Sequence, residues 1–340
     1  MPCMFCRSEM NLTSEHAFPA FMGGELKVRD GSCRVCNGEF GTLEAEIKEN
    51  TKLLLNLLQI ENRYGVVPQA RVNVEIQGMD KKGLLGFVDG KGVLSLSDVV
   101  TETQMPDGRK RQEGFFVSKD SADRFVERAR AKGQKVEELQ FPRQIVVEGT
   151  YSVMLPFALS LEVRKVVAKI ALTAIAHAYG VAFALSGQFD GLRMARNAET
   201  AQALALRIFA NELFMTVHTR TAHQHSVMCY LSAGMQKGWA LVTLFGGLSY
   251  LVEVTSNYRE RDSRQFSIFY DAATKKRINP IVLADEMTVI GHVLSPATTF
   301  EKLEAVDAQW FPIIAAYCAE REIEVERIDG AAAGSPQAQL

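Results

Sequence analysis

The sequence lacks a strong excess of charge of either sign. Its 38 lysine and arginine residues nearly balance its 40 aspartate and glutamate residues, which gives a formal net charge of −2. This balance excludes a protein that attracts nucleic acid through its overall charge. Any nucleic-acid partner must therefore be held by a local basic surface or by a metal ion.

The sequence also lacks a clear membrane-spanning segment and a secretory leader. The longest apolar run covers residues 170–186 and includes His177 and Gly180, which favours a buried helix over a membrane span. No basic stretch followed by an apolar one opens the chain, so we expect a cytoplasmic protein with no membrane partner. No glycine-rich phosphate loop is present, which argues against a nucleotide-hydrolysing site.

What remains is an ordinary globular composition of 340 residues, with 47% hydrophobic and 23% charged residues. At about 100–200 residues per domain, this length suggests two domains. The patterns predict an α+β fold with an N-terminal module at residues 1–60, a larger α+β body at 61–330 and a disordered tail at 331–340. The elements predicted in the body are short strands within 68–118, a helix at 121–131, a strand at 144–147, helices at 161–185 and 198–214, strands at 239–245, 248–255 and 265–271, and a helix at 299–320.

Four of the six cysteines form two pairs with the spacing of metal ligands. Cys3 and Cys6 make the first C-x2-C pair, and Cys33 and Cys36 make the second. In a reducing compartment, two such pairs favour a structural zinc site with four thiolate ligands. The metal would supply much of the folding free energy of so short a segment. Two unrelated cysteine pairs, or a redox dithiol, are the alternatives.

A histidine motif lies between the two cysteine pairs. It reads Thr13-Ser14-Glu15-His16-Ala17-Phe18-Pro19, and the second cysteine pair runs directly into Asn37. With the cysteines around it, this segment closely resembles the HNH endonuclease family in its zinc-binding form. The resemblance covers roughly residues 1–50. It implies a ββα-metal module, in which two antiparallel strands, an extended loop and a helix packed across them form the site.

The resemblance also implies roles for individual residues. His16 matches the general base that takes a proton from the attacking water, which suits an imidazole with an unperturbed pKa of about 6.5. Glu15 matches the acidic ligand of one catalytic metal, and Asn37 matches the ligand on the helix. Both offer the hard oxygen atoms that Mg2+ or Mn2+ accepts. Many family members orient the base through a loop asparagine, which is missing between His16 and Cys33. Asp30 is the nearest substitute, through its backbone carbonyl or its carboxylate.

Each of these residues also has a plainer interpretation. The alternative for His16 is a zinc ligand or a strand-end contact. For Glu15 it is an exposed carboxylate, and for Asn37 a helix cap. A row of cationic residues follows one side of the long predicted helix, at Arg164, Lys165 and Lys169. We interpret this row as a solvated helix face, with a phosphate-contacting surface as the alternative.

The resemblance leads to a functional hypothesis. It implies a metal-dependent endonuclease that hydrolyses phosphodiester bonds in DNA, with a structural Zn2+ and a catalytic Mg2+ or Mn2+. The body at 61–330 would recognise substrate, dimerise or sense a signal, and a homodimer would bring two nicking centres to opposite strands. A role in defence against foreign DNA, including antiviral defence, also follows from the resemblance alone. The alternatives are a zinc-binding nucleic-acid adaptor without catalysis, and cleavage of RNA by the same site.

Overall fold

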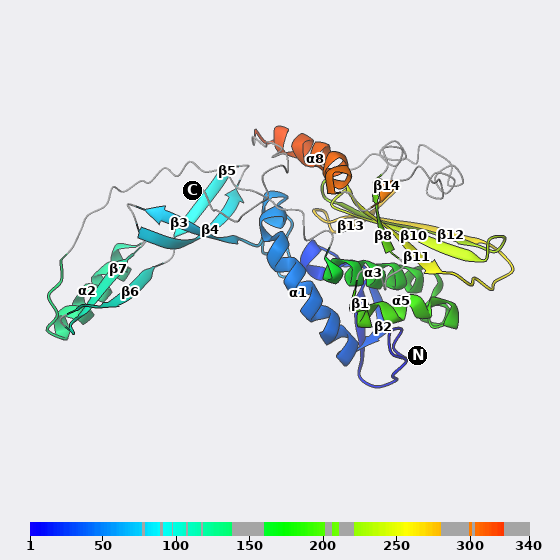
Figure 1. Cartoon of the computed structure of the whole chain (residues 1–340), viewed down its shortest axis with the longest axis horizontal. Helices are drawn as coiled ribbons and strands as arrows, with labels where there is room; N and C mark the ends of the chain where they lie inside the picture. The colour runs from blue at the N-terminus through cyan, green and yellow to red at the C-terminus, as the bar shows by residue number, and fades with distance from the viewer. Residues whose placement is uncertain are drawn as a thin grey trace. The chain divides into compact units, whose positions relative to one another are not determined.

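The structure is a computed structural model, which describes residues 1–76, 79–88, 91–96, 98–106, 108–116, 118–137, 160–200, 206–210, 221–279, 299–300 and 303–322. Contacts between residues divide the chain into two compact units (Figure 1). The first unit consists of Met1–Pro68 and Val153–Ile328, and the second of Gln69–Ser152 and Asp329–Leu340. The N-terminal segment thus shares one unit with most of the body, whereas the sequence interpretation placed a boundary after residue 60.

The first unit begins with a β-hairpin. β1 (Leu12–His16) pairs antiparallel with β2 (Lys27–Cys33), and His16 lies opposite Lys27 in the register. The pairing shifts between Thr13 and Glu15, where the ladder is irregular. Such an irregularity re-aims the side chains beside it, and here it directly precedes the predicted site residues Glu15 and His16.

A long helix follows the hairpin without a linker. α1 (Arg34–Leu57) begins after Cys33, whose Sγ accepts the backbone N–H of Cys36 at 3.5 Å and so caps the helix. Between the two strands lies the short 3-10 helix η1 (Ala20–Met22). Two antiparallel strands followed by a helix confirm the predicted ββα arrangement and the α+β fold class.

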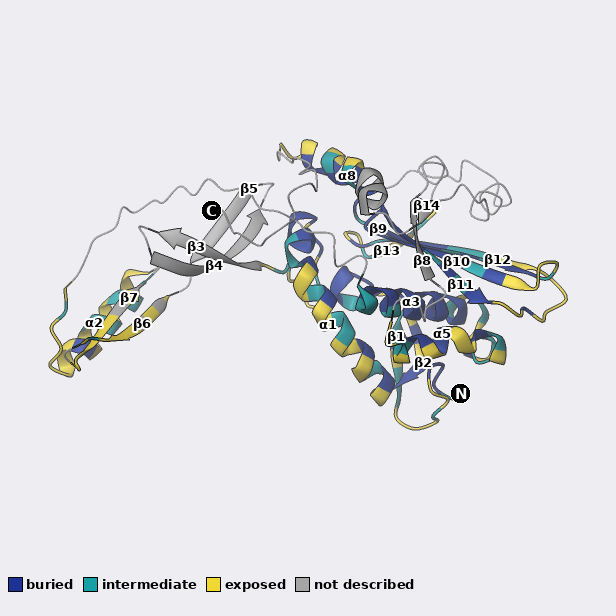
Figure 2. Cartoon of the chain, in the orientation of Figure 1, coloured by how far each residue is buried: buried dark blue, intermediate teal, exposed yellow. Residues whose placement is uncertain are grey.

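A seven-stranded antiparallel sheet forms the centre of the first unit, in the order β13-β12-β9-β10-β11-β8-β14. Its strands are β8 (Leu206–Ala210), β9 (Gln224–Ser232), β10 (Lys237–Leu244), β11 (Leu248–Thr255), β12 (Arg264–Asp271), β13 (Lys276–Ile278) and β14 (Thr299–Phe300). Most residues of β9, β10 and β11 are buried (Figure 2). The three strands predicted from residue 239 to residue 271 are confirmed as β10, β11 and β12.

The helix α3 (Leu161–Tyr179) contacts this sheet as well as α1 and β2. Every residue from Val163 to Ala176 except Lys165 is buried, so α3 is covered on all sides. Gly180, with φ 88°, ends α3 before the predicted end at residue 185, and the short helix α4 (Val181–Ala184) follows. Within the described residues, no helix combines the length and the apolar character that crossing a bilayer requires.

Short elements complete the first unit. Three of them follow α4, namely η3 (Gly187–Phe189), α5 (Asp190–Met194) and η4 (Ala195–Asn197). The last described helix is α8 (Leu303–Ala319), and its Trp310 donates from Nε1 to the carbonyl of Phe245 at 3.1 Å. This bond ties α8 to the end of β10.

The second unit contains the short strands predicted between residues 68 and 118. β3 (Ala70–Ile76), β4 (Met79–Val88) and β5 (Lys91–Leu96) form one sheet, and β6 (Val99–Gln104) pairs with β7 (Lys110–Phe115). The helix α2 (Lys119–Ala131) begins at Ser118, whose Oγ accepts the backbone N–H of Ser121 at 3.2 Å.

One predicted helix is wrong, the strands β9 and β13 were missed, and β14 occupies the first two residues of the helix predicted at 299–320. Residues 206–210, inside the helix predicted at 198–214, form β8 and pair with β11. Pairing with a neighbouring strand overrides the local helix propensity here, because the stability of a strand depends on its contacts with the rest of the sheet. The strand β9 was not predicted, although it lies between β12 and β10. The predicted strand at 144–147 and the predicted tail at 331–340 lie outside the described residues.

Candidate active site and metal centre

The four cysteines of the two C-x2-C pairs come together in space. Cys3 and Cys6 lie in the turn before β1, Cys33 ends β2, and Cys36 lies in the first turn of α1. Their Sγ atoms all lie within 4.8 Å of one another. Four thiolates at this spacing fit a tetrahedral zinc ion, for which each zinc–sulfur bond is about 2.3 Å. The predicted ligand set is thus assembled at the junction of the hairpin and the helix.

The surroundings favour a thiolate at Cys33, whereas burial raises the pKa of Cys6 and of Cys36. Burial alone would raise the pKa of Cys33, but the backbone N–H of Cys36 and the neighbouring thiols outweigh it and lower that pKa to about 7. The guanidinium of Arg196, from η4, donates from Nη1 to the Sγ of Cys36 at 2.7 Å and to the Oε2 of Glu39 at 3.1 Å. A cationic donor next to a metal-bound thiolate is a typical outer-shell partner. The contact of Arg196 with the cysteines was not predicted, because Arg196 lies 160 positions from Cys36.

His16 ends β1 and is half-buried. Its Nδ1 lies 2.8 Å from the carbonyl oxygen of Gly24. A carbonyl oxygen only accepts, so Nδ1 carries the proton and the lone pair of the neutral ring is on Nε2. Burial lowers the pKa of His16 below 6.5. The bond to Gly24 opposes this, and the charges of Lys27 and Lys169 lower the pKa further. The ring therefore stays neutral at neutral pH, the form that accepts a proton.

The group that orients His16 belongs to a glycine turn and not to Asp30. Asp30 lies exposed on β2, and the carbonyl that accepts from the imidazole is that of Gly24. A Cβ on Gly24 would lie 2.2 Å from the carbonyl oxygen of Phe18, and Gly23 has φ 81°. Tyr270, from β12, donates to the Gly23 carbonyl at 2.8 Å. The orienting role predicted for Asp30 thus falls to a turn that only glycine fits, and the Gly-Gly pair was its signal in the sequence.

Substituting Gly24 should disturb this turn. We expect Gly24→Ala to destabilise the protein by about 1–3 kcal/mol, because the added methyl group overlaps the Phe18 carbonyl. A matched control is Gly41→Ala in α1. Nothing lies within 4 Å of a Cβ there, and alanine should stabilise the helix by about 1 kcal/mol. Urea denaturation of both variants measures the difference. Equal stability of the two variants would contradict the close packing of the turn.

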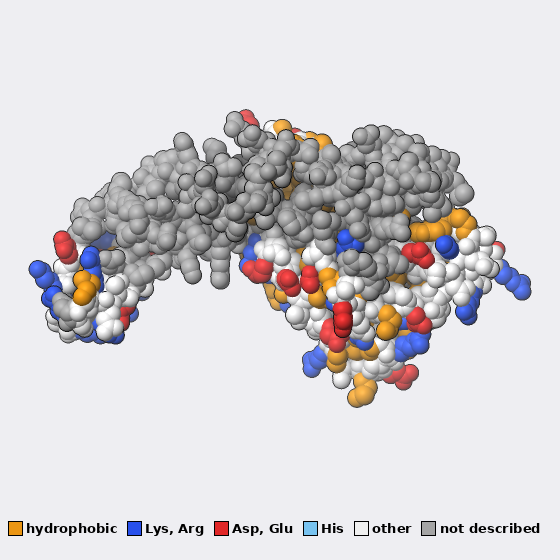
Figure 3. All heavy atoms as spheres, viewed as in Figure 1, with side chains coloured by type: hydrophobic (Ala, Val, Ile, Leu, Met, Phe, Trp, Pro, Cys, Tyr) orange, Lys and Arg blue, Asp and Glu red, His pale blue; other side chains and the backbone are white. Residues whose placement is uncertain are grey.

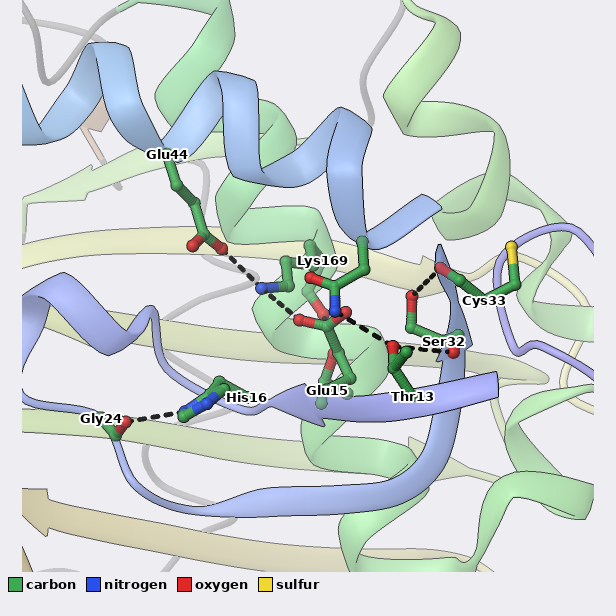
Figure 4. A network of polar contacts seen from close by, with 10 residues as sticks. Thr13, Glu15, His16, Gly24, Ser32, Cys33, Glu44 and Lys169 are labelled. Carbon is green, nitrogen blue, oxygen red and sulfur yellow. Dashed lines mark hydrogen bonds and ion pairs between the residues drawn. The ribbon is translucent and has the colours of Figure 1, made fainter. Parts of the chain in front are cut away.

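Glu15 lies next to His16 in β1, but its side chain points elsewhere. Successive side chains of a strand alternate between its faces. Glu15 points toward Lys169 and Glu44, whereas His16 points toward Gly24 (Figure 4). The Nζ of Lys169 lies 2.6 Å from the Oε1 of Glu15 and 2.6 Å from the Oε1 of Glu44. Glu15 and Lys169 are each only 2% exposed, so this is a buried ion-pair cluster.

The cluster overturns two interpretations from the sequence. Glu15 is not an exposed carboxylate, and Lys169 does not lie on a solvated helix face. Arg164 of the same row is also buried. Burial alone would lower the pKa of Lys169, but the carboxylates of Glu44 and Glu15 outweigh it and raise the pKa. Lys169 is therefore a buried cation between two acidic groups.

Asn37 lies in the first turn of α1, but it does not cap the helix. The cap is Cys33, and the Nδ2 of Asn37 instead donates to the Oγ1 of Thr13 at 3.0 Å. Thr13 in turn donates from Oγ1 to the carbonyl of Ser32 at 3.2 Å. These bonds hold Asn37 against the hairpin. The amide oxygen is left as the atom that could meet a metal.

The donor atoms of the predicted catalytic metal are of the right kind, since Mg2+ and Mn2+ prefer carboxylate and amide oxygens. Their setting does not fit such a metal. Mg2+ usually keeps several water molecules, but Glu15 is buried and already binds the ammonium group of Lys169. In this conformation Glu15 is therefore closed to a hydrated divalent cation.

A second histidine anchors the hairpin loop on the sheet. His225, from β9, is fully buried, and its Nε2 donates to the carbonyl of Met22 in η1 at 3.2 Å. Its Nδ1 accepts the backbone N–H of Phe245 at 3.2 Å. Both ring nitrogens of the neutral imidazole are thus used. Burial lowers the pKa of His225 to about 4. The bond to Met22 and Asp271 oppose this, and His223 adds to the lowering.

This burial predicts instability in acid. Between pH 6.5 and about 4 the unfolded chain binds a proton at residue 225 that the folded chain does not bind, so stability falls as pH falls. The free energy of unfolding falls by about 3 kcal/mol between pH 6.5 and pH 4. We expect His225→Gln, whose amide offers N–H donors and a carbonyl acceptor but does not titrate, to remove this part of the pH dependence. Urea denaturation at pH 7.5 and pH 5 tests this, and an unchanged dependence in the variant would contradict it.

Comparison with known proteins bears on the N-terminal segment. Residues 3–51 match the family model described as HNH endonuclease, and these residues include all four clustered cysteines, Glu15, His16 and Asn37. Searches of curated proteins and of solved structures each found no match to the chain. The family match, the ββα order of elements and the cysteine cluster agree with one another. Residues 3–51 therefore form an HNH endonuclease module at the N-terminus of this chain.

Proposed function

We propose that the chain is an endonuclease that hydrolyses phosphodiester bonds in DNA, with His16 as its general base. The observation that carries the proposal is the bond from Nδ1 to the Gly24 carbonyl, which leaves Nε2 as the basic atom of a neutral ring. A base must be neutral near the working pH and must have a fixed orientation. His16 meets both conditions, because burial lowers its pKa and the glycine turn holds its ring.

In the proposed reaction a water molecule gives a proton to Nε2 of His16 while its oxygen bonds to the phosphorus atom. The bond between phosphorus and the leaving oxygen then breaks, and the leaving oxygen takes the electron pair. Mg2+ or Mn2+ remains the proposed cofactor, which Glu15 and Asn37 would hold and which would neutralise charge on the phosphate. Glu15 could hold such a cation only if its ion pair with Lys169 were broken.

Exposed cations on the hairpin and at the start of α1 suit a polyanionic substrate, and the exposed carboxylates of Glu25 and Asp30 lie on the same hairpin. The described atoms visible in Figure 3 mix acidic and basic side chains instead of forming one basic face. On the hairpin itself, however, Lys27 lies opposite His16 in the register, and Lys27 and Arg29 are both exposed. Arg34, at the start of α1, is exposed as well. Such cations contact phosphate groups without reading sequence, which suits a site that must receive a backbone.

The test compares supercoiled plasmid with labelled RNA, each incubated with the zinc-loaded chain and Mg2+ or Mn2+. We expect nicking of the plasmid and little cleavage of the RNA. Cleavage of RNA alone would favour the ribonuclease alternative. Binding of DNA without cleavage in either metal would favour the adaptor without catalysis.

Two further parts of the proposal concern assembly and role. A homodimer would bring two copies of the module to opposite DNA strands, which a single centre needs for a double-strand break. Double-strand breaks that rise with protein concentration, while nicks precede them, would support it. A role in defence against foreign DNA rests on the family likeness alone.

A further inference from the structure

We propose that Lys169 is a built-in competitor of the catalytic metal. The ammonium group of Lys169 and a divalent cation would exclude one another at Glu15, and the folded chain on its own keeps Glu15 in the lysine-bound state. The inference rests on the proposed function, because it names how the metal site of that nuclease is closed. The chain would then bind its catalytic metal weakly, and nick only at high metal concentration, until Lys169 withdraws.

The first support is the geometry of the cluster formed by Glu15, Glu44 and Lys169. The Nζ lies 2.6 Å from each of two carboxylate oxygens, which are hard ligands of the kind that a divalent cation also takes. The ring of Phe40 covers a further side, with its centroid 5.7 Å from Nζ. The ammonium group thus sits in a cation position lined by oxygens and one aromatic face.

The second support is a carboxylate oxygen of the same cluster that has no hydrogen-bond donor. The Oε2 of Glu15 is buried and has no hydrogen-bond partner among the described residues. A buried carboxylate oxygen without a donor is costly, so such an atom calls for an explanation. Lys169 contacts only the Oε1 of Glu15. A metal ion bound to both carboxylate oxygens, or a water molecule bound to that metal, would give Oε2 a partner.

The third support is the origin of Lys169. It lies in α3, far outside the matched residues 3–51, whereas Glu15 and Glu44 both lie within the module. The body therefore supplies the competing cation to the module. Because α3 is buried along most of its length, Lys169 cannot turn away into solvent without a shift of α3 relative to β1 and α1. A signal that moves α3 would open the metal site.

The test measures binding of Mn2+ to the zinc-loaded full chain by electron paramagnetic resonance, without any substrate. We expect weak binding in the parent and binding roughly 10- to 100-fold tighter in Lys169→Met, which keeps the length of the side chain and removes its charge. Adding Glu15→Gln to Lys169→Met should return the affinity to that of the parent. In the parent background, Glu15→Gln alone should lower the affinity by a much smaller factor than it does in Lys169→Met.

A fourth variant guards against loss of folding. Removing Lys169 leaves the buried carboxylate of Glu15 facing the partly buried carboxylate of Glu44, which is destabilising. Lys169→Met combined with Glu44→Gln keeps the net charge of the cluster while it opens Glu15, and it should also bind Mn2+ more tightly than the parent. Circular dichroism establishes which variants are folded.

The competition is refuted if the parent already binds Mn2+ tightly and loses it with Glu15→Gln, or if neither folded Lys169 variant gains affinity. Plasmid nicking on the same proteins keeps this outcome separate from the proposed function. Tighter Mn2+ binding without nicking would support the competition and contradict the nuclease. Nicking that depends on His16, with equal Mn2+ affinity in all variants, would support the nuclease and contradict the competition.

Discussion

Replacing His16 with alanine should slow plasmid nicking by about 10^2- to 10^4-fold, which corresponds to roughly 3–5 kcal/mol of activation free energy. The expected loss is large because Nε2 is the atom that accepts the proton of the attacking water in the proposed reaction. The cysteine cluster does not involve His16, so the zinc content should equal that of the parent. Single-turnover nicking at saturating metal measures the loss.

Alanine also removes the bond to Gly24, so a matched variant is needed. His16→Asn keeps a side-chain amide N–H that can donate to the Gly24 carbonyl, but it has no basic nitrogen. We expect both variants to lose a similar factor in rate, while the asparagine variant keeps more of the stability of the parent. If His16→Asn nicks as fast as the parent, His16 is a positioning residue for the loop and another group is the base.

Asn37→Ala should fail in a different way. It removes a proposed metal ligand and the bond to Thr13, but leaves His16 in place. We therefore expect a higher Mg2+ or Mn2+ requirement, with nicking partly restored at high metal concentration. An unchanged metal dependence would mean that Asn37 only holds the helix against the hairpin.

The cysteine cluster and the ββα module around His16 could be predicted from the sequence because their signals are local. The three-residue spacing of Cys33 and Cys36 places both sulfurs at the start of α1. The same spacing lets the Sγ of Cys33 accept the backbone N–H of Cys36. The orienting group of His16 was assigned to Asp30, since a missing asparagine was sought by residue type. The actual partner is a backbone carbonyl, which any residue carries, so only the turn geometry of Gly23 and Gly24 identifies it.

The cluster around Glu15 could not be predicted, because it depends on distant packing. Lys169 and Glu44 are 125 positions apart, and nothing in the helical pattern of α3 shows that its charged side is covered. A lysine is usually exposed, and it is buried here only because two carboxylates accompany it. For the same reason residues 206–210 were taken as helix, since their pairing with β11 is a tertiary contact.

Removing the zinc should release the beginning of the chain and the start of α1, and abolish nicking. Structural zinc contributes about 10–16 kcal/mol in zinc-finger peptides, and the four cysteines here have no disulfide to replace it. The loop after β1 has other anchors, because Phe18 stacks on Tyr270 at 5.9 Å and His225 holds Met22. We therefore expect local opening instead of unfolding of the whole unit. Trypsin should cut after Arg7 and Arg34, which are both exposed.

The comparison uses a tight zinc chelator and the variant Cys36→Ser, with Cys229→Ala as the matched control. Cys229 is buried in β9, outside the cluster, so its replacement should leave the zinc content unchanged. Metal analysis and limited proteolysis measure the outcome, and the near-ultraviolet circular dichroism of the sheet aromatics should survive chelation. Full protection of Arg7 and Arg34 in protein verified to be free of zinc would refute the zinc site. Collapse of the sheet signal at the same chelator concentration would mean that the metal holds the entire first unit, and that the anchors at His225 and Tyr270 are too weak to keep it folded.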